Sequence, residues 1–288
     1  MTKKQILDDL IELGISKGDT IFVTIDILRV GYFNKSREIT LSDWVDIFKE
    51  IIGDSGGVVF ASYTRSFLRF AKKDTLFHRF LDTYAGSLPN FIVSDTEAIR
   101  STHPTNSVIG YGQSIKNILE KHNSNTLCYS VMGELIKIPD SKFVMIGTID
   151  KKNAPQAMHF VQEELGYTKY SPYKYLKQIY YEENGKRILF TRRDVGGCSA
   201  GGYRLFAPLL VNNAVKFSNV GKAFSASMPA KKSYEIIKSE LKKNKRIILC
   251  DDKDCIDCYG NPFYNGFGII PFYVKLIFDF KNRILKRL

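Results

Sequence analysis

The stretch Thr20-Ile21-Phe22-Val23-Thr24-Ile25 is the clearest strand signal in this 288-residue chain. Its β-branched and aromatic side chains form a short apolar run that is typical of a largely buried strand. The turn sequence at residues 17–19 precedes it, and an amphipathic helix is predicted before that turn. This helix begins at the capping-box pattern Thr2-x-x-Gln5 and ends at Gly14.

The same alternation of helix and strand continues after this first strand. A helix is expected over residues 42–52, and the apolar run at 58–63 predicts the second strand. Later segments repeat the rhythm: helices at 113–122 and 154–166, with a strand at 143–147 between them. This order predicts an α/β fold, a central mixed β-sheet flanked by helices.

The C-terminal part is richer in aromatic residues and short extended runs. Residues 178–181, 187–191 and 246–250 are expected to form a mixed or antiparallel part of the sheet, and a helix is expected at 231–243. The length suits one large domain or two small ones. Because we find no internal repeat and no low-complexity linker, we take residues 1–288 as a single domain.

The composition narrows the class of protein. No apolar segment follows the N-terminal residues as in a signal peptide, and no apolar run approaches the ~20 residues of a membrane helix. We therefore expect a cytoplasmic protein. The net charge of +12 is compatible with a nucleic acid, an anionic membrane or a small anionic ligand. The basic residues are scattered, which argues against nucleic acid and membrane partners and leaves coenzyme A as a compatible anion.

Five cysteines occur, at positions 128, 198, 250, 255 and 258. An odd number without a secretory signal predicts reduced thiols. The spacing Cys250-x4-Cys255-x2-Cys258 raises the question of zinc, but a structural zinc site needs four ligands, usually as two short pairs. Only one such pair is present, and no histidine follows His159. We therefore favour buried thiols or a loop feature and expect no metal.

The segment Gly197-Cys198-Ser199-Ala200-Gly201 fits the nucleophile-elbow pattern of α/β-hydrolases. In that fold the catalytic histidine follows the serine in the chain. All four histidines precede Ser199, so that fold is excluded and a glycine-rich turn is the better interpretation. A P-loop and a dinucleotide-binding glycine motif are both absent from the sequence.

Two histidines lie in unusual settings. The first is in Arg100-Ser101-Thr102-His103-Pro104-Thr105-Asn106-Ser107, where Pro104 favours extended geometry at His103. Such a density of polar side chains fits either a site-lining loop or a hydrogen-bonded turn. The second is His159, with Gln162 and Glu163 three and four residues further along a predicted helix. Both partners can reach the ring, as the orienting groups of a general base do.

In this order, these segments resemble the aminoglycoside 3-N-acetyltransferase family, also called the antibiotic N-acetyltransferases. The resemblance covers roughly residues 5–170 and rests most specifically on the His-Pro-Thr loop and on the spacing of the 143–147 strand and His159. It also includes the segments Leu13-Gly14-x3-Gly18-Asp19-Thr20, Thr24 to Gly31, Gly57 to Thr64, and Arg100 to Val108. Two departures are visible: Thr24-Ile25-Asp26 stands where the family has a His-Ser-Ser-type segment, and Gln162 stands where it has a glutamate.

The resemblance implies an acyltransferase that passes an acetyl group directly from acetyl-CoA to an amine in a ternary complex. It implies His159 as the general base, with Glu163 and Gln162 as orienting residues. The implied CoA contacts are Asp26, Ile27, Leu28, Arg29, Thr105, Asn106, Ser107 and Val108, and the implied acceptor contacts are Tyr63, Thr64 and His103.

The expected acceptor is a primary amine of an amino sugar or aminoglycoside. One alternative is transfer of a longer acyl group to a nucleotide-linked amino sugar in surface-polysaccharide synthesis. Another is a non-catalytic homologue that binds CoA or another anion. The sequence leaves the acceptor, the acyl length and a homodimer open.

Overall fold

The computed structural model describes residues 1–32, 36–71, 73–150, 152–170, 176–195, 198–265 and 270–285. Its first half contains α1 (Lys3–Glu12), β1 (Thr20–Ile25), α2 (Ile27–Val30), α3 (Arg37–Ile52), β2 (Gly57–Ala61), β3 (Phe67–Leu68), α4 (Ser87–Ile92), β4 (Ile99–Arg100), β5 (Val108–Gly112), η1 (Gln113–Ile115), α5 (Lys116–Lys121), α6 (Ser130–Leu135) and β6 (Lys142–Ile146). Its second half contains α7 (Ala157–Glu164), η2 (Tyr167–Tyr170), β7 (Lys177–Glu183), β8 (Lys186–Thr191), η3 (Gly202–Leu205), α9 (Phe206–Val211), β9 (Lys216–Val220), β10 (Ala223–Pro229), α10 (Ala230–Lys243), α11 (Ile256–Tyr259), α12 (Pro262–Asn265) and α13 (Ile270–Leu285).

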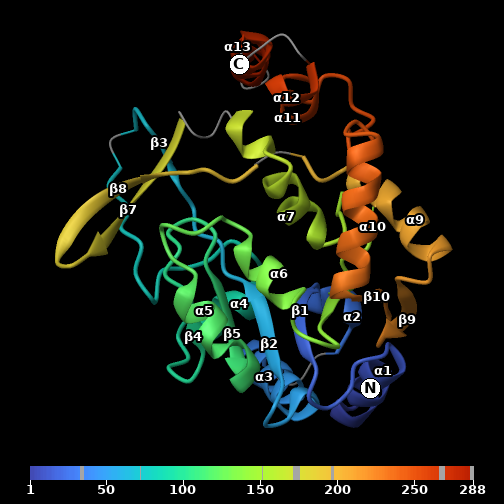
Figure 1. Ribbon diagram of the computed structural model, residues 1–288. Helices are drawn as coiled ribbons and strands as arrows, with labels where there is room; N and C mark the ends of the chain where they lie inside the picture. The colour runs from blue at the N-terminus through green and yellow to red at the C-terminus, as the bar shows by residue number, and fades with distance from the viewer. Residues whose placement is uncertain are drawn as a thin grey trace.

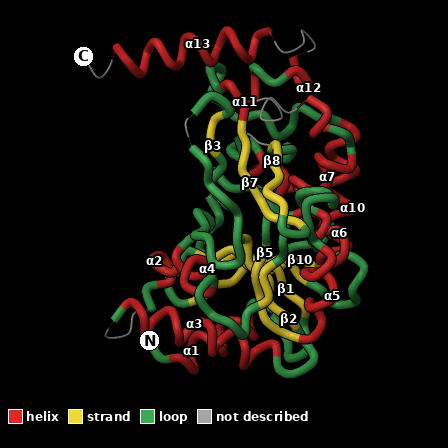
Figure 2. The backbone as a smooth tube through the Cα atoms, turned by 90° about the vertical axis from the view of Figure 1, so that its left-hand side faces the viewer, coloured by secondary structure: helices red, strands yellow, loops and turns green. Residues whose placement is uncertain are grey.

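The central sheet has seven strands within the described residues, in the order β4-β5-β2-β1-β6-β10-β9. The strands β2, β1 and β6 are parallel, and antiparallel pairs extend the sheet on both sides. A separate three-stranded sheet has the order β3-β7-β8. Figure 2 shows the central sheet in the lower half of the molecule and β3, β7 and β8 above it. The predicted central mixed sheet is therefore confirmed.

Helices cover both faces of this sheet because side chains alternate along its strands. In β1, Ile21 and Val23 face a core built with α1, α3 and α4, in which Trp44 is fully buried. Phe22 faces the opposite core, which is built with α5, α6, α7, α9 and α10. The result is a three-layer α/β arrangement (Figure 1).

Most of the predicted elements are present. Helix α1 has both hydrogen bonds of the predicted capping box. The expected strand at 246–250 is wrong, because this segment forms a turn and its carbonyls bond a side chain instead of a neighbouring strand. Arg204 donates to the carbonyl oxygens of Ile247 and Leu249. The antiparallel edge beyond β6 is formed by β10 and β9, which the sequence patterns did not indicate. The predicted strands at 178–181 and 187–191 are present as β7 and β8, but they pair with β3 in the separate sheet, so their expected place in the central sheet is wrong.

The helices in the described part of the chain are each too short or too polar to span a lipid bilayer. At the carboxyl ends of β1, β2 and β6, the chain continues into Asp26, Ser62 and Gly147. Ligands of open α/β sheets bind outside the carboxyl ends of the strands, at the point where the connections diverge. Because β1 lies between β2 and β6, this rule predicts a ligand site formed by the segments that follow these three strands.

Candidate active site

His159 lies in α7, which packs against α10 on one face of the sheet (Figure 1). The ring is partly buried, and its Nδ1 atom lies 2.8 Å from Oε1 of Gln162. The Nε2 atom of Gln162 donates to the Tyr264 hydroxyl at 3.1 Å, and the amide oxygen faces the ring. Nδ1 therefore carries the hydrogen, and Nε2 keeps a free lone pair.

Two further side chains contact this imidazole. The Tyr129 ring stacks on it with centroids 5.3 Å apart, and the Ser199 hydroxyl oxygen lies 3.5 Å from Nε2. Burial lowers the pKa of His159 below its ordinary value, partly offset by the Gln162 hydrogen bond. The ring is therefore neutral at pH 7 and can accept a proton at Nε2.

A buried ion pair lies beside this group. Arg192 donates from Nε and from an Nη atom to the two carboxylate oxygens of Asp194, both at 2.6 Å, and the Asp194 side chain is almost fully enclosed. The two charges act on His159 in opposite directions, because Asp194 raises its pKa and Arg192 lowers it. Sequence reasoning found neither residue, since nothing in the segment after β8 matches a known pattern.

Glu163 occupies a different place from the one expected. Its two carboxylate oxygens accept hydrogen bonds from the backbone N–H groups of Cys128 and Tyr129, at 2.9 and 2.8 Å. Burial raises the pKa of Glu163 to about 7, although both backbone hydrogen bonds oppose this shift. Of the two sequence-predicted orienting residues, Gln162 contacts the ring, while Glu163 instead holds the segment that carries Tyr129.

The turn expected to contact CoA follows β1 directly. The Asp26 carboxylate caps α2 by accepting from the backbone N–H groups of Leu28 and Arg29. Arg29 also donates to the Gly147 carbonyl at the end of β6 and pairs with Asp150. Leu28 is 76% exposed, whereas Ile27 is buried. Leu28 and Arg29 thus offer most of the surface of this turn to a ligand, and the Asp26 side chain is 36% exposed.

The His-Pro-Thr loop is a buried, hydrogen-bonded turn. Nδ1 of His103 accepts from the backbone N–H of Asn106 at 3.0 Å, and the ring stacks on His122 with centroids 4.9 Å apart. The expected ligand contacts in this loop are at most 3% exposed, so their side chains offer almost no surface to CoA or to the acceptor. They are His103, Thr105, Asn106, Ser107 and Val108.

The two remaining acceptor-side candidates differ. Tyr63 is partly buried, and its ring centroid lies 6.4 Å from that of Tyr129, the residue stacked on His159. Thr64 is buried and donates its hydroxyl to the Pro104 carbonyl, which ties the segment after β2 to the His-Pro-Thr loop. The structure therefore places Tyr63 against Tyr129, the ring that stacks on the histidine, and leaves Thr64 in the interior.

Ser199 is a contact that sequence reasoning set aside. Chain order excludes the α/β-hydrolase fold, but it does not decide which side chains meet in space, since serine–histidine pairs occur in several chain orders. The glycine-rich turn predicted here is described only from Cys198 onward, and Gly197 lies outside the described residues.

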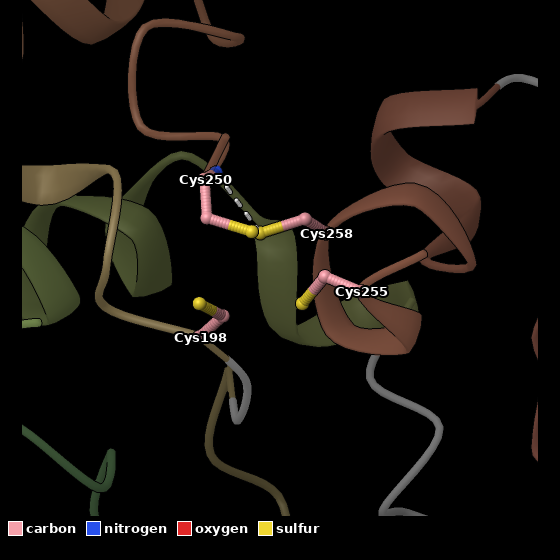
Figure 3. Close-up of side chains that lie close together, drawn as sticks. All are labelled: Cys198, Cys250, Cys255 and Cys258. Carbon is pink, nitrogen blue, oxygen red and sulfur yellow. Dashed lines mark hydrogen bonds between the residues drawn. The ribbon is translucent and has the colours of Figure 1, made fainter. Parts of the chain in front are cut away.

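Cys198, beside Ser199, belongs to a group of four cysteines. The sulfur atoms of Cys198, Cys250, Cys255 and Cys258 all lie within 4.8 Å of one another. Figure 3 shows the four side chains close together, carried by three segments of the chain. The sequence-based argument counted only the three cysteines close together in the chain. Cys198, which lies 52 residues before Cys250, joins them in space as a fourth.

The family profile for aminoglycoside 3-N-acetyltransferases matches residues 23–242, which is most of the chain. The chain belongs to this family. Members are N-acyltransferases, as expected from the resemblance, and the match extends well beyond residue 170. No curated protein sequence matches the chain.

Solved structures show the same fold. The apoenzyme of aminoglycoside acetyltransferase AAC(3)-IVa superimposes with a TM-score of 0.71 and 16% identity, covering 91% of this chain and 96% of the other. AAC-VIa bound to sisomicin gives 0.68 and 19%, covering 84% and 98%. The binary complex of AAC-IIIb with CoASH gives 0.63 and 17%, covering 84% and 97%.

Proposed function

We propose that this protein transfers an acetyl group from acetyl-CoA directly to a primary amine of an amino sugar or aminoglycoside, with His159 as the general base. The observation that carries the proposal is the His159–Gln162–Tyr264 chain of hydrogen bonds. It favours one tautomer, with the proton-accepting nitrogen directed away from the helix toward Ser199.

The chemistry requires such a base. An alkyl amine is protonated at neutral pH, and only the free amine attacks the thioester carbonyl. The ammonium form loses one proton to solvent before the attack. Nε2 of His159 accepts the second proton as the amine nitrogen attacks the thioester carbonyl, and the tetrahedral intermediate then collapses with cleavage of the C–S bond. The imidazolium returns its proton to the departing CoA sulfur, which leaves as the free thiol. A neutral imidazole at pH 7 suits this step, and burial lowers the pKa of His159 in that direction.

The charges around His159 bear on the imidazolium that forms. Gln162 offers a neutral oxygen to Nδ1 and therefore no charge. The negative charge that raises the pKa of His159 is that of Asp194. Asp194 is itself paired with Arg192, which limits its pull on the ring. The expected base is therefore weaker and less easily protonated than a histidine with a carboxylate partner.

We assign the CoA side to the turn after β1, through the exposed Leu28 and the half-exposed Arg29. The net charge of +12 and the CoASH complex of AAC-IIIb support an anionic CoA donor. The acceptor side is assigned to Tyr63 and the aromatic residues around it, and the sisomicin complex of AAC-VIa supports an amino-sugar acceptor.

The test is a transfer assay that follows release of the CoA thiol. Acetyl-CoA and acyl-CoA donors of increasing length are paired with sisomicin, gentamicin, simple amino sugars and nucleotide-linked amino sugars. The proposal expects the highest kcat/KM for acetyl-CoA with an aminoglycoside or simple amino sugar. Preference for a longer donor with a nucleotide-linked sugar, or acetyl-CoA binding without turnover on any amine, would refute it.

A further inference from the structure

The four-cysteine cluster is the strongest unassigned feature of the described chain. Cys250 and Cys258 are buried, and Cys198 and Cys255 are partly buried. They come from three separate segments: the loop before η3, the segment after α10, and the start of α11 (Figure 3). The proposed catalytic reaction uses none of these thiols.

From this geometry we infer that Cys198, Cys250, Cys255 and Cys258 form a structural tetrathiolate zinc site. A tetrahedral zinc with Zn–S bonds of about 2.3 Å places its sulfurs about 3.8 Å apart. Sulfur atoms that all lie within 4.8 Å of one another need only small shifts to reach that arrangement. A cluster of several irons would hold its cysteines farther apart, so one metal ion fits the separation.

Backbone groups around the cluster suit thiolates. The N–H of Cys250 approaches Sγ of Cys258 at 3.4 Å, and the N–H of Ala200 approaches Sγ of Cys198 at the same distance. Donors of this kind stabilise coordinated sulfur and fix its orientation. With four protein ligands, the site has no open coordination position, which is typical of structural zinc rather than catalytic zinc.

The surrounding core explains why the segment needs a metal. In the described residues 249–265, the buried hydrophobic side chains are limited to Leu249, Cys250 and Cys258. A core this small supplies little stabilisation, and short segments of this kind usually depend on a metal or a disulfide. Zinc binding would supply that free energy directly, since metal binding and local folding are coupled.

The site also borders the proposed active site. Cys198 precedes Ser199, which faces His159, and α11 leads into α12, which carries the Tyr264 hydroxyl bonded to Gln162. Gln162 and Tyr264 line the same small pocket as Cys198 and Cys258. Zinc would therefore fix, from outside α7, two of the segments that surround the imidazole.

The first experiment measures metal in the full-length protein, purified without chelator from zinc-supplemented cells. Elemental analysis should find about one zinc per chain, as expected for a closed four-ligand site. Growth in cobalt should give the visible d–d and thiolate charge-transfer absorption of tetrahedral Co²⁺. A folded wild-type protein without bound zinc, with iron in its place, or with a disulfide in intact-mass analysis would overturn the inference.

Variants localise the site. Cys255→Ala should lose zinc and open the exposed segment around Lys253 to trypsin, whereas Cys128→Ala should retain both zinc and protection. Cys128 is a matched control because it is a buried free thiol outside the cluster. Equal zinc in both variants would contradict the assignment. Because metal content is read without substrate, failure here would be distinct from failure of the acetyl transfer.

Discussion

Replacing Gln162 by glutamate tests the proposed base through its pKa. The amide oxygen lies 2.8 Å from Nδ1 of His159. A carboxylate there would favour the imidazolium, so we expect Gln162→Glu to raise the pKa of the histidine. Two unit charges about 4 Å apart at an effective dielectric constant of about 20 interact by about 4 kcal/mol. This corresponds to a shift of about 3 pK units.

The shift should be smaller because the ring is partly exposed. The new carboxylate would also be buried, since position 162 is 6% exposed, and burial raises the pKa of the carboxylate itself. Measured shifts for such pairs are about 1–3 units. The sign is definite: a raised pKa means that the base stays protonated to higher pH. The acidic limb of the kcat/KM profile against pH, which reports the free enzyme, should therefore move to higher pH by at least about one unit.

The matched control is Gln162→Leu, which removes the hydrogen bond without adding charge. We expect its acidic limb not to move upward, while kcat falls about tenfold for the loss of roughly 1.4 kcal/mol of orienting interaction. If the limb of Gln162→Glu coincides with that of the wild type, the imidazole at position 159 is not the group that sets the pH dependence.

Four further outcomes are expected. His159→Ala should lower kcat by about 100-fold or more with an unchanged melting temperature, and unchanged turnover would remove this residue from the mechanism. Ser199→Ala should lower kcat far less than that, and intact mass during turnover should reveal no acyl adduct; an adduct lost in the variant would indicate a covalent route. Glu163→Ala should destabilise the protein by about 2–4 kcal/mol, because two buried backbone N–H groups lose their acceptor, and denaturant unfolding measures this. Burial lowers the pKa of His122 to about 4 in the folded protein, whereas its pKa in the unfolded chain is about 6.5. The stability that the neutral ring contributes is therefore fully present above about pH 6.5 and is lost as the pH falls toward 4. The unfolding free energy of wild type minus that of His122→Asn should thus fall by about 3 kcal/mol between pH 7 and pH 4. The raised pKa of Glu163 makes the unfolding free energy rise as pH falls in the same range, but both proteins contain Glu163, so this contribution cancels in the difference. A difference that stays constant between pH 7 and pH 4 would refute the lowered pKa of His122.

Local patterns in the sequence determined the elements of the α/β core. The apolar run of β1 and the capping box of α1 depend on residues that are close together in the chain. Both elements can therefore be predicted without knowledge of the fold. The His159–Gln162 contact was also predictable, since residues three apart on a helix lie on the same side. Helix geometry alone could not choose between Gln162 and Glu163.

Tertiary structure decided the rest, because those contacts join residues that are distant in the chain. Glu163 accepts hydrogen bonds from backbone N–H groups 35 and 34 residues away. The His103 ring is fully buried and contacts His122 and Phe190, which lie far from it in the chain. Cys198 meets the three later cysteines only when the chain after α10 folds back beside it. Sequence spacing identifies cysteines that are close along the chain, such as the last three of this group. A site built from three separate segments can be recognised only in the folded structure, because packing brings those segments together.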